Sequence, residues 1–300
     1  MKVHQNVVID GVDLGAPARK GSKFTNEGKW DNFIKPLLPD GEVFIEYGSN
    51  AGMFLKLAQY RQVIGLERSK NDCKVAVEYR GDNDYQIIQA DINKYDLDTL
   101  PLADVTLLAN FHYHQEVSEF MRLLNILENR TCYVIIVSVE QEERKWRAQP
   151  FSKDVKHYFR HWELVKEIRL PDEKDPYPRP MYSMLFKSPK IERVPLEKII
   201  VKNSTSREYE YHRRFVRDTL LGKNYKETDY YRIQARRKRN KWSQETLNTF
   251  MEGKYQLVKN VSAEGIREPL VVDRNFNLVD GTHRYFTLLE LGQSAIIRVL

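Results

Sequence analysis

The stretch Val43-Phe-Ile-Glu-Tyr-Gly-Ser-Asn-Ala-Gly-Met-Phe54 decides the fold class of this chain. An apolar run stops at an acidic residue, Glu46, and a loop with Gly48 and Gly52 then leads into an apolar helix start. The glycine spacing departs from the G-x-G-x-x-G pattern that cradles a pyrophosphate. A carboxylate beside such a strand-to-helix turn suits a ligand with a hydroxylated or cationic part.

An alternation of apolar strands and helices continues on the C-terminal side of this turn. It predicts strands over 43–46, 62–67, 85–90, 103–109 and 132–138, helices over 53–59, 70–79 and 117–128, and closing strands over 159–170 and 180–187. Such βαβ alternation predicts a parallel sheet with helices on both faces. The proline-rich segment 171–180 is either an exposed polar loop or a lid over a substrate site.

The flanking segments differ in character from this core. Residues 1–40 form a lead-in, in which Trp30, Phe33 and Ile34 share one helical face. A second unit starts near Lys190. It predicts an opening strand and turn over 194–201, charged helices over 207–260, strands over 268–273 and 276–279, a turn over 280–284, a helix over 285–291 capped by Gly292, and a last strand over 295–300.

Composition indicates a soluble protein of one large or two ordinary domains, with 300 residues, 41% hydrophobic and 30% charged. No apolar run approaches the roughly 20 residues that span a bilayer, and the N-terminus lacks the apolar core of a secretory signal. Cys73 and Cys132 provide neither a metal site nor a disulfide framework. We therefore expect a cytoplasmic location, no membrane partner and no metal.

The charge is unevenly distributed. Residues 1–150 hold 18 Lys/Arg and 22 Asp/Glu, whereas residues 151–300 hold 30 and 20. Most of the basic excess lies in 201–250, with 13 basic and 6 acidic residues. This asymmetry predicts two domains with different partners, over 1–190 and 191–300, the second with a basic helical insertion at about 209–245.

Polar residues end four successive predicted strands: Glu46, Glu67, Asp91 and Asn110. Because ligands of open α/β sheets sit outside the carboxyl ends of the strands, these residues converge on one crevice. Glu67 lies where an acid accepts both ribose hydroxyls, and Asp91 where an adenine amino group would lie. Each acid alone could be a helix cap, but four polar ends in series beside a glycine turn are less easily explained that way.

Residues 20–190 resemble the class I S-adenosylmethionine-dependent methyltransferases. The resemblance implies a seven-stranded, doubly wound, Rossmann-like sheet with S-adenosyl-L-methionine as cofactor. The glycine turn would hold its methionine part, Glu67 its ribose, and Asp91 with Ile92 its adenine; Glu46 stands where this family often has Asp. The matching stretches are 44–52, 63–67, 89–91 and 107–114, and the implied cofactor-binding residues are Glu46, Gly48, Ser49, Asn50, Gly52, Glu67, Asp91, Ile92 and Asn110.

The segment Asn110-Phe-His-Tyr-His114 lies near the expected methyl group. Amino-methylating DNA enzymes resemble Asn-Pro-Pro-Tyr here, and neither these prolines nor paired catalytic cysteines for C5-pyrimidine methylation are present. His112 or His114 could serve as general base toward a hydroxyl, or could pack against the cofactor or cap the next helix. The pattern favours oxygen methylation of a small molecule, of sugar, nucleoside or natural-product type.

Asp280-Gly-Thr-His-Arg284 follows a predicted strand and opens a helix. Its backbone N–H groups suit an anion, and His283 and Arg284 can add charge-assisted hydrogen bonds to phosphate. The alternative is a tight turn with a surface arginine.

Residues 192–300 resemble the ParB/sulfiredoxin-like fold, in which a glycine-histidine-arginine turn follows a hairpin like 269–279. The resemblance implies a smaller α+β domain that binds a nucleotide, with Mg; some members are nucleoside triphosphatases, nucleases or small-molecule kinases. Thr282 stands where sulfiredoxins use cysteine, so sulfinic-acid reduction is not expected. The implied phosphate-site residues are Asp280, Gly281, Thr282, His283 and Arg284, with Glu197 as a candidate acid/base residue.

The basic insertion carries the cationic run Arg232–Trp242, preceded by His212–Arg217 and by Tyr230-Tyr231. Basic residues interleaved with aromatics fit phosphate contacts and base stacking; the alternative is a solvated helix face that folds against the acidic first domain. Nucleic acid is therefore a candidate partner through 212–242.

The preferred function is a small-molecule O-methyltransferase with a nucleotide-binding domain. The alternatives are an RNA- or DNA-directed methyltransferase and a non-catalytic nucleic-acid-binding or regulatory module.

Overall fold

The computed structural model describes residues 8–9, 12–13, 26–139, 155–169, 181–202 and 207–300. The chain forms two compact units. Unit 1 comprises Met1–Thr99 and Ala103–Pro189, and unit 2 comprises Leu100–Leu102 and Lys190–Leu300.

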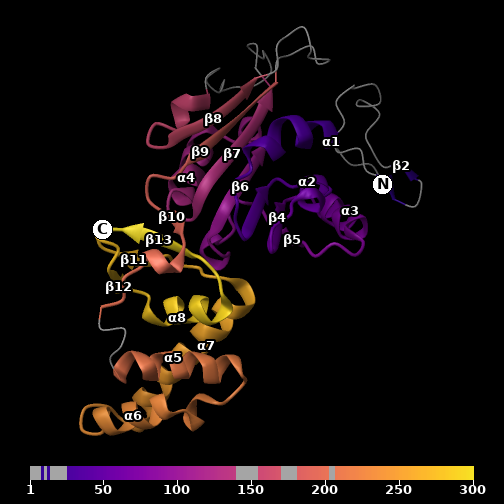
Figure 1. The fold of residues 1–300 in the computed structure, drawn as a ribbon. Helices are drawn as coiled ribbons and strands as arrows, with labels where there is room; N and C mark the ends of the chain where they lie inside the picture. Colours follow the sequence, from indigo (N-terminus) through magenta and orange to yellow (C-terminus); the bar gives the residue numbers. More distant parts are fainter. Residues whose placement is uncertain (1–7, 10–11, 14–25, 140–154, 170–180, 203–206) are drawn as a thin grey trace. The chain divides into compact units, whose positions relative to one another are not determined.

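Unit 1 is built on a seven-stranded mixed sheet of order β5-β4-β3-β6-β7-β9-β8 (Figure 1). Its strands β3 to β7 are parallel, and β9 runs antiparallel to both of its neighbours. After β3 the chain adds β4 and β5 on one side of the sheet, and after β6 it adds β7 on the opposite side. The topological switch point therefore lies between β3 and β6. The strands are β3 (Val43–Tyr47), β4 (Gln62–Glu67), β5 (Gln86–Gln89), β6 (Ala103–Ala109), β7 (Thr131–Val139), β8 (Glu163–Arg169) and β9 (Met181–Lys187).

The α/β prediction is confirmed, with close agreement on the strands: β4 and β6 have the predicted bounds. The five residues of β3 are all buried, as expected for a central parallel strand covered on both faces.

The remaining elements of unit 1 are β1 (Val8–Ile9), β2 (Val12–Asp13), α1 (Asn26–Lys29), the π-helix η2 (Trp30–Ile34), α2 (Met53–Leu57), α3 (Lys70–Arg80), α4 (Val117–Leu127), and the 3-10 helices η3 (Lys35–Leu37), η4 (Leu97–Thr99), η5 (His112–His114) and η6 (Val155–Tyr158).

Helices cover both faces of this sheet. On one face the Trp30 ring of η2 stacks on Phe54 of α2 at 6.2 Å and meets Phe44 of β3 edge-on at 6.4 Å. The predicted helical face of Trp30, Phe33 and Ile34 is buried, as expected. On the other face Phe159 stacks on Phe186 of β9 at 4.0 Å and meets Phe120 of α4 edge-on at 6.3 Å.

A buried carboxylate joins the beginnings of two central strands. Asp104 of β6 accepts hydrogen bonds from the backbone N–H groups of Glu42 at 2.7 Å and Val43 at 2.9 Å. Gly41 approaches so closely that a Cβ there would lie 2.5 Å from the Asp104 Cβ. This contact lies at the amino end of the parallel strands, opposite the edge at which the polar strand ends were predicted to gather.

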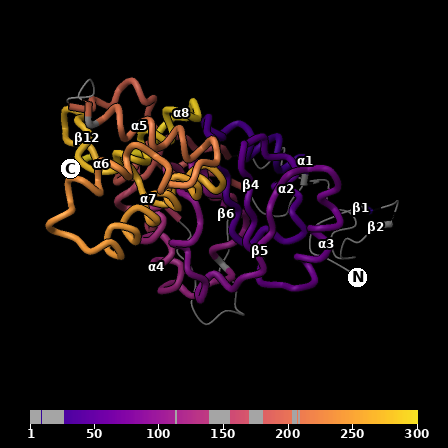
Figure 2. The backbone as a smooth tube through the Cα atoms, turned by 90° about the horizontal axis from the view of Figure 1, so that it is seen from below, coloured from indigo at the N-terminus to yellow at the C-terminus, as the bar shows by residue number. Residues whose placement is uncertain are grey.

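In its described residues, unit 2 combines a four-stranded sheet of order β10-β13-β11-β12 with four α-helices. Helices α5, α6, α7 and α8 lie side by side (Figure 2) around Phe215, Met251 and Val258, each of them fully buried. The elements are β10 (Glu192–Val194), η8 (Leu196–Lys198), α5 (Arg207–Leu220), η9 (Tyr225–Glu227), α6 (Asp229–Lys238), α7 (Gln244–Glu264), β11 (Leu270–Val272), β12 (Leu278–Asp280), α8 (Thr282–Leu291) and β13 (Ala295–Val299).

The predicted boundaries of unit 2 need two corrections. Helix α8 begins at Thr282 and not at Tyr285, so Arg284 lies in its first turn; Gly281, with φ +100°, caps this end, and its carbonyl accepts from the Tyr285 N–H at 2.8 Å. The opening strand is β10, which ends where the predicted strand begins, because Pro195 has no N–H to donate. Gly292, with φ +66°, is the predicted C-cap. The predicted loop or lid over 171–180 lies outside the described residues.

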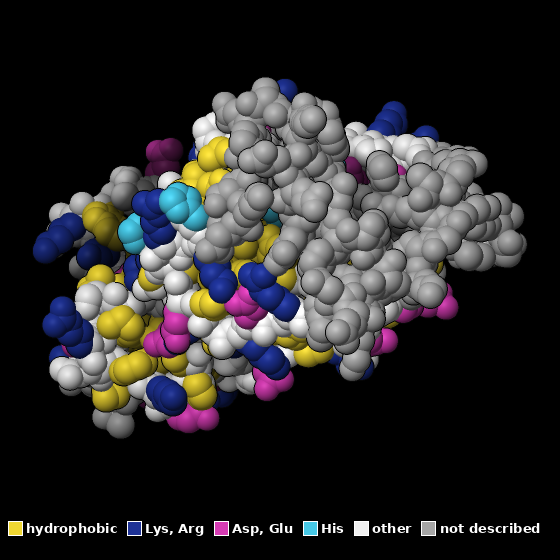
Figure 3. Space-filling view, turned by 90° about the horizontal axis from the view of Figure 1, so that it is seen from above, with side chains coloured by type: hydrophobic (Ala, Val, Ile, Leu, Met, Phe, Trp, Pro, Cys, Tyr) yellow, Lys and Arg dark blue, Asp and Glu magenta, His cyan; other side chains and the backbone are white. Residues whose placement is uncertain are grey.

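On the face shown in Figure 3, basic, acidic and apolar side chains are interspersed over the described residues. Among the described residues, no helix has the length and apolar character needed to cross a membrane.

Candidate functional site

The glycine turn between β3 and α2 uses three left-handed backbone positions, Gly48 (φ +72°), Asn50 (φ +53°) and Gly52 (φ +77°). The N–H groups of Gly48 and Ser49 both donate to the Leu66 carbonyl of β4, at 2.8 and 3.1 Å. The turn therefore folds back over the neighbouring strand. Glycine suits positions 48 and 52 because it has no Cβ to oppose a positive φ.

The turn also touches the segment that follows β6. A Cβ at Gly48 would lie 3.0 Å from Cδ2 of Phe111, so a larger residue would press on that ring. The two strands on either side of the switch point thus bring their following loops into contact. Asn110 immediately precedes Phe111 in the segment that makes this contact.

Glu67 at the end of β4 is held by two backbone donors. Its Oε2 accepts from the Asn50 N–H at 3.0 Å, and its Oε1 accepts from the Ser69 N–H at 2.7 Å. A carboxylate offers about four acceptor positions, so two of them can still receive ligand hydroxyls. The structure brings Glu67 and the glycine turn together at one edge of the sheet.

Asp91 after β5 forms a local turn. Its Oδ1 accepts from the Asn93 N–H at 3.1 Å, and Ile92 beside it is buried. The Asn93 side chain donates to Oε1 of Gln115 at 3.0 Å. This bond links the loop after β5 with the segment after β6, so all four strand ends lie along one connected edge.

Glu46 is a buried acid, with 1% of its surface exposed. Burial raises the pKa of its carboxyl well above the usual range, and the charge of Glu67 raises that pKa further. Among the described residues, Oε2 of Glu46 and Oδ1 of both Asn50 and Asn110 are buried with no hydrogen-bond partner. Such atoms carry a free-energy penalty until a donor reaches them. Ser49 also has an unpartnered hydroxyl within this part of the chain, but its side chain lies against Gly65 of β4.

The structure separates the two candidate histidines. His112 is buried, with Nε2 3.4 Å from the Ser138 hydroxyl and its ring 5.9 Å from that of Phe120. His114 is exposed at the end of η5. Asn110 precedes both in a left-handed conformation, φ +54°. An exposed imidazole is open to an acceptor molecule, whereas a buried one is held by the packing around it.

In unit 2 the charge of Arg284 is matched within the protein. Its guanidinium donates to the carboxylates of Glu268 at 2.7 Å and Asp280 at 2.9 Å, and 8% of its side chain is exposed. His283 is buried with Nε2 3.1 Å from Nδ1 of His212, and burial lowers its pKa well below the usual value, helped by Lys254 and His212. Glu197 is exposed in η8.

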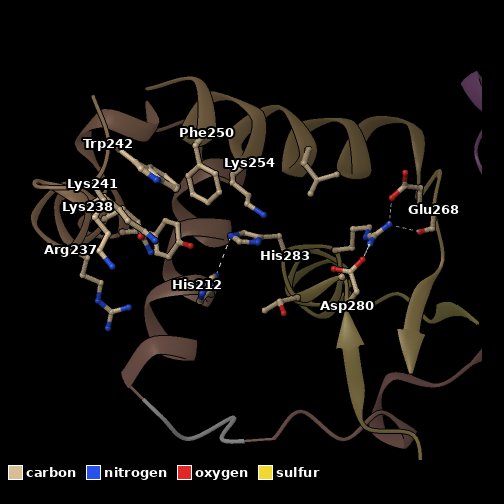
Figure 4. A pocket seen from close by; sticks show the side chains of 16 residues that line it. His212, Arg237, Lys238, Lys241, Trp242, Phe250, Lys254, Glu268, Asp280 and His283 are labelled. Atoms are coloured by element: carbon tan, nitrogen blue, oxygen red, sulfur yellow. Dashed lines mark hydrogen bonds and ion pairs between the residues drawn. The ribbon is translucent and has the colours of Figure 1, made fainter. Parts of the chain in front are cut away.

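A cavity of about 650 Å³ adjoins this cluster, and Figure 4 shows its lining. Asp280, Gly281, Thr282, His283 and Arg284 all line it, together with members of the basic insertion. Its walls also include Phe250, Lys254 and Glu268, which were not predicted from the sequence. Phe250 and Lys254 are four residues apart on α7, a spacing that shares one helix face, but the sequence does not show what this face meets. Among the described residues, no three His, Cys, Asp or Glu side chains group as a metal site.

Comparisons with known proteins give matches at the level of structure. No protein-family model matches the chain, and no curated protein matches it. The N-methyltransferase NodS from Bradyrhizobium japonicum WM9, solved with S-adenosyl-L-homocysteine, is 13% identical with a TM-score of 0.48, over 58% of this chain and 92% of NodS. A SAM-dependent methyltransferase from Aquifex aeolicus is 16% identical with a TM-score of 0.40, over 54% and 94%. The bifunctional kinase-methyltransferase WbdD is 19% identical with a TM-score of 0.41, over 65% and 45%.

Proposed function

We propose that unit 1 is an S-adenosylmethionine-dependent methyltransferase whose cofactor lies along the carboxyl ends of β3, β4, β5 and β6. The observation that carries the proposal is the convergence of Glu46, Asn50, Glu67 and Asn110 at the switch point of the sheet. Open α/β sheets place their ligands at this point. The doubly wound sheet supports the same assignment, because it is the one that the sequence resemblance implies.

The residues of this edge fit the cofactor. S-adenosylmethionine would supply an electrophilic sulfonium methyl group, and it carries an ammonium and two ribose hydroxyls. The buried oxygens of Glu46, Asn50 and Asn110 lack donors among the described residues, and ammonium hydrogens would satisfy them. The two remaining acceptor positions of Glu67 suit the ribose hydroxyls. Ile92 would provide an apolar surface for the adenine.

We further propose that the acceptor is a hydroxyl of a small molecule. A hydroxyl must lose its proton as the methyl group is transferred, and imidazole takes up protons near neutral pH. His114 is exposed where the proposal places the acceptor and would act as the general base. His112, held by Ser138 and Phe120, would position the segment.

For unit 2 we propose the ParB/sulfiredoxin-like assignment, supported by the hairpin of β11 and β12 that leads through Gly281 into α8. A second candidate for the whole protein is methylation of RNA or DNA. It is favoured by the basic side chains of α6 and of the loop after it, which would grip a phosphate backbone.

Two measurements test these assignments. Calorimetric titration with S-adenosyl-L-homocysteine tests the cofactor assignment. If the wild-type protein binds neither this compound nor S-adenosylmethionine, the proposal is wrong. Transfer of a radiolabelled methyl group to small metabolites, to RNA and to DNA then separates the acceptors. A small-molecule product whose new methyl carbon is shown by carbon NMR to be attached to oxygen supports the hydroxyl acceptor, whereas label in a polynucleotide selects the second candidate.

The histidine roles have their own test. His114→Gln should lower kcat several-fold, with the loss shrinking as the pH is raised, while binding of S-adenosyl-L-homocysteine is retained. An unchanged pH profile would contradict the role of His114 as base.

A further inference from the structure

An apolar cluster joins the glycine turn of unit 1 to two other segments of the chain. Its members come from the turn itself, from helix α3 and from the N-terminal strand β1: Ala51, Val75, Tyr79 and Ile9. Ala51 and Val75 are fully buried, and the other two side chains pack against them. Ala51 stands between two residues with left-handed backbones. Its packing therefore supports the part of the turn in which the chain direction changes most sharply.

Helix α3 holds the far side of the turn through contacts that do not involve β1. A Cβ at Gly52 would lie 3.3 Å from the Cβ of Ala76, so the turn approaches α3 closely at this point. The Tyr79 hydroxyl donates to Sδ of Met53, at the start of α2, at 3.1 Å. Ile9 is thus the member of the cluster that comes from outside this strand-turn-helix region.

Ile9 belongs to a short antiparallel hairpin, in which β1 pairs with β2 through Val8 with Asp13 and Ile9 with Val12. A two-stranded hairpin is at best marginally stable in water on its own, so its order depends on what it packs against. Strand β1 contacts α3, and Figure 2 shows both strands beside that helix. The hairpin therefore docks on unit 1 at the cluster that supports the glycine turn.

Hairpin docking and the ordering of the turn share this set of contacts. Asn50, next to Ala51, has a buried Oδ1 without a hydrogen-bond partner among the described residues, and it is one of the atoms that the proposed cofactor would meet. A residue that holds such a group in place need not touch the ligand itself. A ligand that binds only the ordered turn also favours the docked hairpin, and docking raises the affinity for that ligand by the same factor.

We propose that Ile9 is a positioning residue for the cofactor turn. Docked through Ile9, the N-terminal hairpin holds Ala51, and with it Asn50 and Gly52, in the geometry that binds S-adenosylmethionine. Ile9 acts through Ala51 and not by contact with the cofactor. This role rests on the proposed function of unit 1 and extends it to the lead-in segment.

Calorimetry on the full-length protein tests this role, with S-adenosyl-L-homocysteine as the probe. Ile9→Ser removes the apolar contact and should weaken binding by about fivefold or more, because affinity falls with the fraction of molecules in which the turn is held. Ile9→Val retains most of the side chain and should bind nearly as tightly as the wild type. Val77→Ser makes a matched change on α3, at a residue that is 52% exposed, and should leave the affinity unchanged.

Two further measurements separate positioning from a general loss of stability. An undocked hairpin leaves the rest of unit 1 folded. The Tm of ligand-free Ile9→Ser should therefore stay close to that of the wild type, while the gain in Tm on adding S-adenosyl-L-homocysteine shrinks. Hydrogen exchange at β1 in the wild type should slow when the ligand binds at the glycine turn, and Ile9→Ser should lose this slowing.

Several results would overturn the role of Ile9 and leave the methyltransferase assignment intact. They are equal affinity of the wild type and Ile9→Ser, tighter binding by Ile9→Ser, and equal weakening in Ile9→Ser and Val77→Ser. A lower ligand-free Tm with an unchanged gain on adding ligand would show that Ile9 only stabilises the fold. A wild-type protein that binds neither S-adenosyl-L-homocysteine nor S-adenosylmethionine would instead remove the proposed function, and the role of Ile9 with it.

Discussion

The Glu67 carboxylate accepts a hydrogen bond from the backbone N–H of Asn50 at 3.0 Å. The acid that ends β4 thereby holds the loop that follows β3, although 17 residues separate the two in sequence. A second backbone bond, from Ser69, fixes the other carboxylate oxygen. Glu67 is thus part of the structure of the site as well as a candidate ligand contact.

Glu67→Ala should weaken binding of S-adenosyl-L-homocysteine by about tenfold or more, because hydrogen bonds to a charged group contribute about 1.5–3 kcal/mol each. Titration calorimetry measures the effect. Glu78→Ala, at an exposed position of α3, removes the same charge and should leave the affinity unchanged. Equal affinity in wild type and Glu67→Ala would remove Glu67 from the cofactor site.

Glu46→Gln should stabilise the ligand-free protein and weaken its cofactor binding. The pKa of Glu46 is raised in the folded state, so the folded protein holds this proton more tightly than the unfolded chain does. Wild-type stability relative to Glu46→Gln is therefore greatest below about pH 4.3, the ordinary value for Glu, and declines as pH rises toward the folded pKa. Thermal melts from pH 4.5 to 8 check this, and a constant Tm difference would contradict it.

The structure shows which features the sequence could predict. Continuous apolar runs with polar ends defined β4 and β6 to the residue, because buried parallel strands admit little else. Glu46, Glu67, Asp91 and Asn110 were expected on one edge because parallel strands share their carboxyl end. Their individual contacts were not predictable. The bond from Asn50 to Glu67 depends on a left-handed turn that folds back over β4.

The cavity of unit 2 could not be predicted from the sequence. Lys238, Phe250 and Thr282 line one cavity but come from three helices, and no local pattern records how these helices pack. The basic run suggested an anion, yet the internal ion pairs of Arg284 could not be inferred from the turn that contains it. The types of residue at each turn can be read from the sequence, whereas the pairing of their charges depends on the tertiary structure.

Asp104→Ala should destabilise unit 1 by about 2–6 kcal/mol, because the N–H groups of Glu42 and Val43 would lose a buried acceptor at about 1–3 kcal/mol each. Asp104→Asn retains a carbonyl oxygen and should cost less. Urea denaturation compares the two. Similar stability of Asp104→Ala and wild type would show that the contact contributes little.

Acidification should destabilise unit 2 through His283. Its pKa is lowered in the folded state by burial, by Lys254 and by His212, so the unfolded chain binds the proton more readily. The stability contribution is complete above about pH 6.5, the ordinary value for His, and is lost as pH falls toward the folded pKa. Wild type should lose more stability than His283→Gln between pH 7.5 and 5.5, and parallel denaturation curves would contradict this.

Gly48→Ala should damage both the fold and the cofactor site. Alanine would have to adopt φ +72° and place its Cβ 3.0 Å from the Phe111 ring, at a cost of about 1–2 kcal/mol for the backbone and more for the contact. Gly292→Ala, with φ +66° in the left-handed region and no atom within 4 Å of its Cβ, introduces left-handed strain without a contact. Phe111→Leu should relieve the contact in the double variant and leave the strain. Denaturation curves of these variants therefore separate the cost of the backbone strain from the cost of the contact with Phe111. Strictly additive effects of Gly48→Ala and Phe111→Leu on the free energy of unfolding would mean that the ring does not resist the new Cβ.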